Sequence, residues 1–478
     1  MSVRKNYIFN VLLSGVNLLY PLITFPYVAR VLQPEGLGQA QFTFNFALYF
    51  SVIAAFGIPF YGIKEIGRSR STEKDLNKTF SELFTISSIT SIFCLVIYLL
   101  SIIALPAIEI NWELGLIAGF LIFLTPLNLD WVFSGLEEFK LIAQRAICIK
   151  VIALVLLFTL VKDSSDVALY LSILTFSYVG NYLMNLLLIR KRVSFSFSNL
   201  NLRKHQKPLL FILSSSFATT IYTSLDSVVL GLLTDDYEVG IYAAAVKLAK
   251  VSLPIVTGLS AVIMPKIALA IKEKDLLYER SMINKSFSFI VFLGIPISMG
   301  LFIFSEEFIL LLSGVTYLQS VSSMMYLSFL PFFIGLGYLF GFQVLVPNNL
   351  NIGLFTSTLL GVIVFVISNY LFTQEMGAKG TAISVLLTEI TVTGSYLLHC
   401  PRNLTSGLPY RELFFALLST VFFYPILLWI DFLAGTLFIK VGIAILLSAI
   451  SYFSLQFFFF NNEIIKTFIH SIKTKIKP

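Results

Sequence analysis

The sequence predicts an all-α polytopic membrane protein with about fourteen transmembrane helices. Its 478 residues are 57% hydrophobic and only 12% charged, whereas a soluble domain carries about 25% charged residues. Apolar stretches long enough to cross a bilayer recur from one end of the chain to the other. The longest polar links, near 64–78, 190–207 and 266–283, are too short to hold a soluble domain. Lipid must therefore serve as part of the solvent of this chain.

The individual spans follow from their length, because a bilayer core about 30 Å thick is crossed by about 20 apolar residues of helix. The first stretch lacks a convincing A-x-A cleavage site, so we expect it to remain as a span and not to be removed as a signal peptide. The seventh and eighth spans are the least apolar, since they carry Ser, Thr or Lys residues that a lipid-facing helix avoids. The predicted spans are 7–32, 39–63, 79–106, 113–136, 139–161, 165–189, 208–233, 238–265, 284–304, 318–346, 350–373, 378–400, 411–433 and 436–460.

The distribution of basic residues predicts the orientation of the spans, because cytoplasmic loops are enriched in Lys and Arg. With the N-terminus inside, 26 of the 33 basic residues fall in inside loops and four fall outside. A missed span would invert every later loop and remove this bias. We therefore expect an even number of spans and two cytoplasmic termini. The four outside residues are Arg30, Lys162, Lys379 and Lys440.

A weak internal repeat divides the chain. Pro126 and Pro331 lie 205 residues apart, each about ten residues before a glycine, and Gly38 and Gly240 lie 202 residues apart. Because each half would contain six spans, both halves start on the same side of the membrane and the repeats are parallel. The predicted parts are an N-terminal six-helix lobe (1–190), a basic cytoplasmic linker (191–207), a C-terminal six-helix lobe (208–400), and two additional helices with a basic tail (401–478).

Ionisable side chains inside the predicted spans are the candidates for chemistry, because such groups are costly in a bilayer and usually face a bundle interior or cavity. Lys247 and Lys250 are three residues apart and share one helical face. Two interpretations remain open: ion pairs that lock helices together, or a wet cavity that receives an anionic cargo. Three mid-membrane lysines cannot all reach the interface, which favours the cavity. The buried candidates are Asp130, Lys150, Asp226, Lys247, Lys250 and Glu389.

Several catalytic and cofactor motifs are absent from the sequence. It contains no P-loop, no H-E-x-x-H and no G-x-S-x-G, and its three histidines and three cysteines show no metal-ligand spacing. We therefore expect neither an enzyme nor a bound cofactor or metal, and no nucleic-acid partner.

Three segments resemble the Wzx-type polysaccharide flippases. They are NLLYPLITFPYVARVLQPEGLGQAQF (Asn17–Phe42), LDWVFSGLEEFKLIAQRAICIK (Leu129–Lys150) and GFQVLVPNN (Gly341–Asn349). The resemblance covers the full length of the chain. It places the chain in the polysaccharide-transport branch of the MOP superfamily, beside the MATE drug exporters and the MurJ lipid II flippase.

The resemblance implies a V-shaped pair of six-helix lobes and a function in the bacterial cell membrane. Its cargo would be an undecaprenyl-diphosphate-linked oligosaccharide, carried from the cytoplasmic to the outer leaflet by alternating access for O-antigen, capsule or exopolysaccharide. Lys150, Lys247, Lys250 and Arg30 would line a cationic cavity for the diphosphate. The carboxylates of Asp130, Asp226 and Glu389 would bind coupling ions or balance these charges. The other expected partners are membrane lipids and a polymerase and chain-length regulator of the same pathway.

Two other classes of protein fit the sequence less well. A cation-coupled MATE-like exporter of small molecules favours an acidic cavity for cationic drugs, and three buried lysines argue against it. A membrane polysaccharide polymerase or ligase usually carries a large outer loop with catalytic basic residues, whereas the predicted outer loops are short and hold four Lys and Arg.

Overall fold

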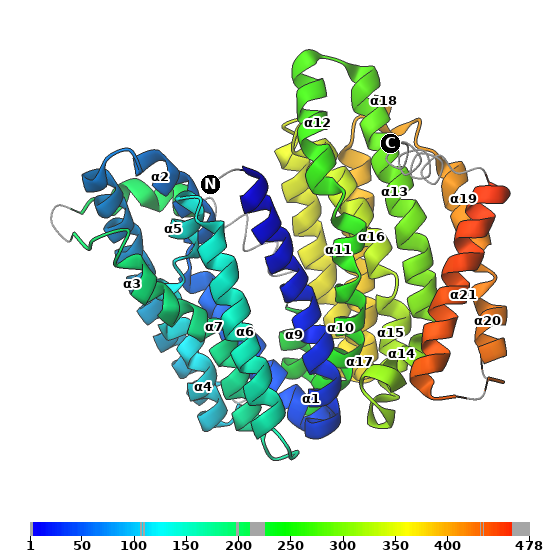
Figure 1. Cartoon of the computed structure of the whole chain (residues 1–478), viewed down its shortest axis with the longest axis horizontal. Coiled ribbons are helices and arrows are strands. Elements are labelled where there is room, and N and C mark those ends of the chain that lie inside the picture. Colours follow the sequence, from blue (N-terminus) through cyan, green and yellow to red (C-terminus); the bar gives the residue numbers. More distant parts are fainter. Residues whose placement is uncertain are drawn as a thin grey trace, which may run out of the picture. The chain divides into compact units, whose positions relative to one another are not determined.

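The computed structural model describes residues 3–105, 108, 110–196, 200–210, 225–430, 432–433 and 435–460. These residues form helices and connecting turns, and no strand occurs among them. The prediction of an all-α fold is therefore confirmed. The chain divides into two compact units, Met1–Gly240 and Ile241–Pro478, coloured from blue to green and from green to red in Figure 1.

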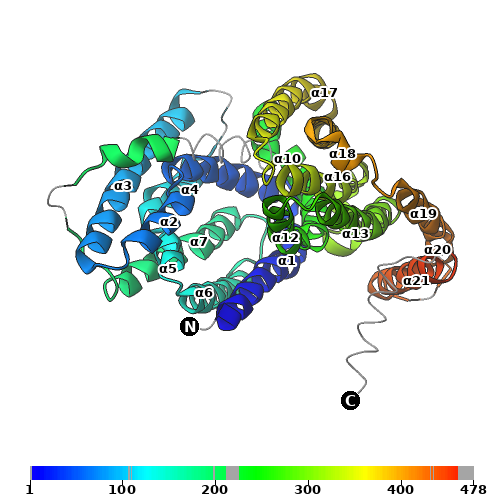
Figure 2. The same ribbon diagram turned by 90° about the horizontal axis from the view of Figure 1, so that it is seen from above.

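The first unit is built around α7, which packs against α1, α4 and α6. Figure 2 shows α7 enclosed by the other helices of this unit. The elements of the unit are α1 (Val3–Ala54), α2 (Ile58–Ser69), α3 (Glu73–Ala104), α4 (Trp112–Phe123), the 3-10 turn η1 (Thr125–Leu127), α5 (Asp130–Gly135), α6 (Phe139–Leu160), α7 (Val167–Ile189), a helical stretch at 203–210, α9 (Asp226–Leu233) and the first residues of α10 (Asp236–Val251).

The second unit is built around α13, which packs against α12, α16 and α19 over a large apolar core. After α10, its elements are α11 (Leu253–Thr257), α12 (Ser260–Glu273), α13 (Leu276–Ile303), α14 (Ser305–Leu312), the 3-10 turn η2 (Val315–Tyr317), α15 (Ser320–Leu327), α16 (Leu330–Gly337), the π-helix η3 (Tyr338–Leu345), α17 (Asn351–His399), α18 (Arg402–Thr405), α19 (Tyr410–Thr420), α20 (Phe423–Ile430) and α21 (Leu437–Phe458).

Within the described residues, ten helical stretches are long and apolar enough to cross a membrane, or eleven if α4 and α5, which bend by 41°, count as one span. Two of the ten are much longer than a bilayer requires. A residue with a non-helical backbone interrupts the helix in each, Gln33 (φ 61°) in α1 and Gly377 (φ 55°) in α17. These breaks separate span 7–32 from 39–63 and span 350–373 from 378–400. Every predicted span except 208–233, most of which lies outside the described residues, thus has a helical counterpart.

Prolines account for several of these breaks. Gln33 precedes Pro34, and the residue before a proline is sterically disfavoured in the α region. Pro126 lies in η1 between α4 and α5, and Pro331 lies in the first turn of α16 after the break that ends α15. The two prolines of the predicted repeat therefore occupy equivalent positions, each beginning a new helical segment inside a span.

Helix α3 shows how these helices divide lipid-facing from protein-facing residues. One face carries large exposed apolar side chains, among them Ile92, Phe93 and Leu100. The opposite face buries small or polar side chains such as Ser87 and Ser91. Because lipid is as apolar as leucine, close packing of small residues and hydrogen bonds hold such helices together, and burial of apolar surface contributes little.

A backbone crossing joins α1 to the start of α10. A Cβ atom on Gly38 would fall 1.6 Å from the carbonyl oxygen of Asp236, and one on Gly240 would fall 1.9 Å from the carbonyl oxygen of Pro34. Only glycine permits so close an approach. The contacts are reciprocal, because the repeat offset of 202 residues maps Gly38 onto Gly240 and Pro34 onto Asp236.

This crossing explains why the first compact unit extends to residue 240, beyond the predicted linker 191–207. Helix α9 also packs on α1. The division into lobes 1–190 and 208–400 remains a prediction.

Candidate functional site

Lys150 lies on α6, half-buried, where its side chain meets α1. Its ammonium donates a hydrogen bond to Oδ1 of Asn17 and lies 5.1 Å from the centroid of the Tyr20 ring. Such a cation–π contact is worth about 0.5–1 kcal/mol at exposed sites and about 2 kcal/mol when desolvated. In the part of the chain that the structure describes, no carboxylate lies within salt-bridge distance of Lys150. Neutral groups therefore hold this cation, and its charge is not balanced by a described carboxylate.

Aromatic and amide groups lie next to this lysine. Tyr20 lies near Tyr170 and Tyr178 of α7. The Tyr178 side chain is 40% exposed, and its ring centroid lies 5.3 Å from that of Phe44. Gln41 donates a hydrogen bond to the Tyr170 hydroxyl at 3.4 Å. Residues on both sides of the Gln33 kink in α1 thus lie beside polar and aromatic residues of α6 and α7.

Asp130 at the start of α5 is paired with Arg145 of α6. The Arg145 side chain is 2% exposed, and its Nη2 lies 2.6 Å from Oδ1 of Asp130. Its Nε donates to Oδ1 of Asn181 at 3.2 Å, and its Nη1 donates to Oδ1 of Asn185. Asn185 also donates to Oδ1 of Asp130 at 3.2 Å. The described ionic partner of Asp130 is therefore Arg145, and its predicted role in ion coupling or in balancing the lysines stays a prediction.

The sequence predicts that Arg145 is one of the basic residues on the cytoplasmic side, because it lies near one end of the predicted span 139–161. The structure instead buries it among α5, α6 and α7. The available signal was the spacing of Asn181 and Asn185 on α7, one helical turn apart, which provides two amide acceptors on a single face.

Arg30 and Asp226 lie apart from Lys150 in the same unit. Arg30 is exposed, in the last turn before the kink of α1, and its carbonyl oxygen accepts from Nε2 of Gln33 at 2.6 Å. Asp226 begins α9 and is 3% exposed. Its Oδ1 accepts from the backbone N–H of Ser227 at 2.8 Å, and it interacts electrostatically with Tyr49 of α1.

Lys247, Lys250 and Glu389 belong to the second unit. Both lysines are half-buried on α10, and Glu389 is 5% exposed on the second arm of α17, near Tyr396. The predicted pairing of Glu389 with these lysines and their place in a cationic cavity remain predictions.

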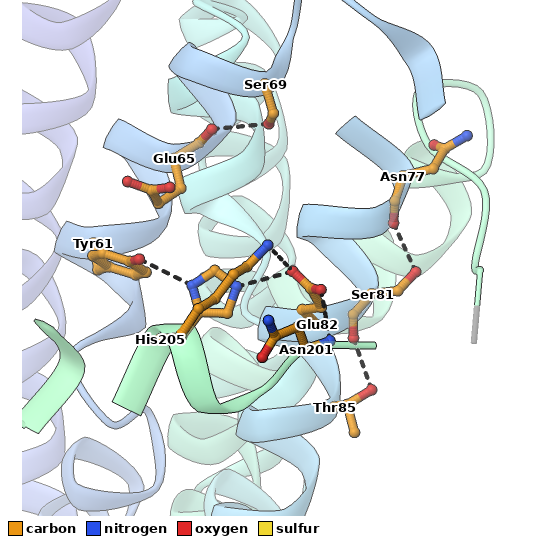
Figure 3. A network of polar contacts seen from close by, with 10 residues as sticks. Tyr61, Glu65, Ser69, Asn77, Ser81, Glu82, Thr85, Asn201 and His205 are labelled. Atoms are coloured by element: carbon orange, nitrogen blue, oxygen red, sulfur yellow. Dashed lines mark hydrogen bonds and ion pairs between the residues drawn. The ribbon is translucent and has the colours of Figure 1, made fainter. Parts of the chain in front are cut away.

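A buried polar cluster that was not predicted from the sequence lies between α2, α3 and residues 200–205 (Figure 3). Glu82 and His205 are 0% and 1% exposed. Oε2 of Glu82 lies 2.6 Å from Nζ of Lys204 and 3.0 Å from Nε2 of His205. Nδ1 of His205 lies 2.9 Å from the Tyr61 hydroxyl. The sequence gives little local signal for this cluster, because His205 lies in the predicted linker 191–207 and Glu82 lies near the start of the predicted span 79–106.

The second unit contains a related arrangement at its GFQVLVPNN segment. Glu279 of α13 is 2% exposed and accepts a hydrogen bond from Nδ2 of Asn348 at 3.0 Å. Gln343, fully buried in the π-helix, donates to Oγ of Ser260 at 2.7 Å. Gln343 of the π-helix therefore bonds to α12, and Asn348, which follows the π-helix, bonds to α13.

A pocket of about 530 Å³ in the first unit is lined by α9, the start of α10 and two residues of α1, Glu35 and Phe42. Its ionisable lining is acidic, since Asp235 and Asp236 join Glu35. This pocket therefore does not match the predicted cationic site.

The chain matches a protein-family model and two curated relatives. The family described as "Polysaccharide biosynthesis protein" matches residues 3–270, more than half of the chain. A candidate O-antigen transporter of Shigella dysenteriae is 23% identical over 395 residues, covering 82% of this chain and 98% of the relative. Another from Escherichia coli K12 is 25% identical over 416 residues, covering 84% and 98%.

Solved structures are similar in fold. The lipid II flippase MurJ in an inward closed conformation superposes with a TM-score of 0.75 at 15% identity, covering 96% of this chain and 100% of that one. An inward-facing multidrug resistance MATE family transporter of the MOP superfamily gives 0.65 at 16% identity, covering 81% and 95%. The family resemblance read from the three sequence segments is thereby confirmed: this polytopic membrane protein, with the fold shared by MurJ and MATE transporters, belongs to the polysaccharide biosynthesis protein family.

Proposed function

We propose that this protein is a flippase that moves undecaprenyl-diphosphate-linked oligosaccharide repeat units from the cytoplasmic to the outer leaflet of the bacterial cell membrane. Membership of the polysaccharide biosynthesis protein family, two relatives described as candidate O-antigen transporters and the MurJ-like fold support this function. Both termini are cytoplasmic in the proposal, as the distribution of basic residues predicts.

The environment of Lys150 is the single observation in the site that favours a diphosphate-linked cargo. Asn17 and Tyr20 hold its ammonium in place without neutralising it. A diphosphate would supply the missing negative charge, and lysine is a flexible point-charge ligand for phosphate. Removing the ammonium therefore removes attraction to the anionic part of the cargo and leaves the helix intact.

The groups beside Lys150 suit the sugar part of the same cargo. The half-exposed face of Tyr178 offers apolar area to a sugar ring, and the exposed amide of Asn17 offers hydrogen bonds to hydroxyl groups. Lys247 and Lys250, on α10, are further residues that we propose to attract the anionic cargo. A polymerase and a chain-length regulator of the pathway would take the repeat unit onward after it is released.

The test deletes the gene, measures surface polysaccharide, and restores it with wild-type protein or with Lys150→Ala, Lys247→Ala or Lys250→Ala. We expect each variant to restore less polymer than wild type while being present in the membrane at the same level. Lys162→Ala is the matched control. Lys162 also lies over a tyrosine of α1, 5.9 Å from the Tyr27 ring centroid, but in the predicted outer loop after α6. Full restoration by all three variants would refute the cationic site.

The location of the accumulated intermediate separates a flippase from a polymerase. In the deletion strain, a flippase defect leaves lipid-linked repeat units in the cytoplasmic leaflet, protected from a glycosidase added to the outside of spheroplasts. Repeat units that are fully exposed to this enzyme would show that transfer across the membrane still occurs and would contradict the proposed function.

A further inference from the structure

Residues 194–196 and 200–205, which belong to the predicted linker, lie along one face of α3. Backbone N–H groups of Ser194, Ser196 and Asn201 donate to Asn77 Oδ1, Ser81 Oγ and Glu82 Oε1, each at 2.8 Å. These side chains lie within about one and a half turns of α3. The Phe195 ring also packs on Phe80 and Phe84 of α3, with centroid distances of 5.0 Å, and His205 bonds to Tyr61 of α2.

His205 is the residue through which the segment contacts both helices. Its ring is buried, with Nε2 directed at Glu82 and Nδ1 at the Tyr61 hydroxyl (Figure 3). An ionised carboxylate only accepts hydrogen bonds, so Nε2 carries the hydrogen. In the neutral ring, Nδ1 then accepts, and the Tyr61 hydroxyl donates to it.

Adding a proton to Nδ1 reverses the bond to Tyr61. The imidazolium has two donors, so the Tyr61 oxygen must become the acceptor and its hydrogen must turn elsewhere. The hydrogen bond between the ring and Tyr61 survives with its direction exchanged. The same His205 side chain can therefore occupy this site in either protonation state without leaving it.

The added charge changes the balance at Glu82. With neutral His205, the ammonium of Lys204 neutralises the carboxylate, and both residues share the single oxygen Oε2. With protonated His205, two cations compete for one carboxylate in a site surrounded by apolar residues of α2, α3 and α5. The Lys204 side chain is 43% exposed, whereas His205 is not, so Lys204 is the cation that can move into water.

The other charged or titratable groups near the ring are few in the described part of the chain. From α2, Glu65 and Arg68 act on Tyr61 and form an ion pair with each other at 3.2 Å. From α3 the facing group is Glu82, and from the segment itself it is Lys204. Glu65 and Arg68 have opposite charges and pair with each other, whereas Glu82 contacts His205 directly and Lys204 contacts the same carboxylate oxygen.

We infer that His205 is a proton-binding site, and that its protonation releases Lys204 from Glu82 and loosens residues 200–205 from α3. Histidine is the side chain whose charge ordinarily changes between about pH 5 and 8. The inference goes beyond the proposed flippase function and does not depend on the identity of the cargo. It gives the chain a proton-responsive latch on the segment predicted to connect its two lobes.

Proton binding can be observed directly, because the chain has three histidines. In full-length protein in lipid nanodiscs, labelled with ¹³Cε1-histidine, the signal that disappears in His205→Gln identifies His205. We expect this signal to move between two limiting positions from pH 8 to pH 5. A signal that stays at one position over this range would overturn the inference.

Release of residues 200–205 is measured by the reactivity of Lys204 toward an amine-labelling reagent, mapped by mass spectrometry. Exposed Lys207 on the same helical stretch is the internal reference that corrects for the pH dependence of the reagent. We expect the labelling ratio of Lys204 to Lys207 to rise several-fold on acidification. In His205→Gln, whose amide can keep both hydrogen bonds but cannot titrate, the ratio should stay constant.

Two results would contradict the latch. One is a ratio that does not change with pH in the wild type, and the other is an equal rise in His205→Gln. If His205→Gln fails to fold, Tyr61→Phe replaces it: the ring then lacks its hydroxyl partner, and its signal should follow a different pH curve from wild type. An unchanged curve would equally count against the site as described.

Discussion

The buried Arg145 offers the sharpest test of how charge is held within the first unit. Its guanidinium is 2% exposed and contacts three acceptors, on Asp130, Asn181 and Asn185. Breaking a buried ion pair by removing one partner costs about 3–5 kcal/mol, mostly because the other charge is left uncompensated. Here the Asp130 side chain is 45% exposed and can recover part of its hydration. We therefore expect Arg145→Gln to lower the free energy of unfolding by about 3 kcal/mol, the lower end of that range.

The pairing itself is tested by a double-mutant cycle. Asp130→Asn keeps an acceptor oxygen but leaves the buried guanidinium without a counter-charge, for a cost of about 2 kcal/mol. The double variant contains neither charge, so it should be no less stable than Arg145→Gln alone. The resulting non-additivity is about 2 kcal/mol, well above the few tenths found for independent sites.

The assay is unfolding by SDS titration in mixed micelles, followed through tryptophan fluorescence. Trp131, adjacent to Asp130 and 4% exposed, reports on this region. Arg68→Gln is the matched control: Arg68 is 66% exposed and pairs with Glu65, so its loss should cost at most about 1 kcal/mol. Costs that add within about 0.5 kcal/mol would show that Arg145 and Asp130 do not act as a pair and would refute the reasoning.

Three further predictions concern packing, a buried hydroxyl and pH. Gly38→Ala should destabilise the protein by at least about 2 kcal/mol in the same titration, because its Cβ would meet the Asp236 carbonyl. The control is Gly67→Ala, whose Cβ meets no atom within 4 Å and which should stabilise α2 by up to about 1 kcal/mol. Equal effects of the two substitutions would contradict the close backbone contact at Gly38. Tyr452→Phe removes a buried hydrogen bond of 2.9 Å to a backbone carbonyl of α13 and should cost about 1 kcal/mol, and no change in the unfolding midpoint would exclude this bond. Two backbone N–H groups of its own turn hold the pKa of the Asp166 carboxyl below its usual range, so the stabilisation of this turn is present above about pH 4 and is lost as the pH falls through the lowered value. The protection factor of the turn, which is the intrinsic hydrogen-exchange rate at each pH divided by the measured rate, should therefore fall at acidic pH in wild type and not in Asp166→Asn, and the same response in both would disprove the assignment.

The spans could be predicted because each follows from a local property, the length of an apolar run. Some of the helix breaks inside the spans could also be predicted. Pro34 and Pro126 interrupt helices for reasons that lie in their own rings and in the residues before them. The kink at Gly377 has no such neighbour, although Gly is the residue that tolerates its positive φ.

The candidate site was predicted only in part. Lys150 stood out because a lysine in the middle of an apolar run is costly wherever its partners are. Arg145 did not stand out, because its position near the end of a span predicts a cytoplasmic side chain. Only the structure shows that two amide groups of α7 accept hydrogen bonds from it. Glu82 and His205 are 123 residues apart in the chain, and nothing local to either indicates that they share a hydrogen bond.

The sequence by itself therefore determined that this protein is all-α, that it crosses the membrane many times, and that it resembles polysaccharide flippases. These conclusions rest on apolar length and on short motifs, which act locally. Only the tertiary structure decided which charges meet. It placed Arg145 on Asp130 and Lys204 with His205 on Glu82, and it left Lys150 among neutral groups. The physical reason is that the cost of a buried charge depends on its partners in space, and these come from helices far apart in the sequence.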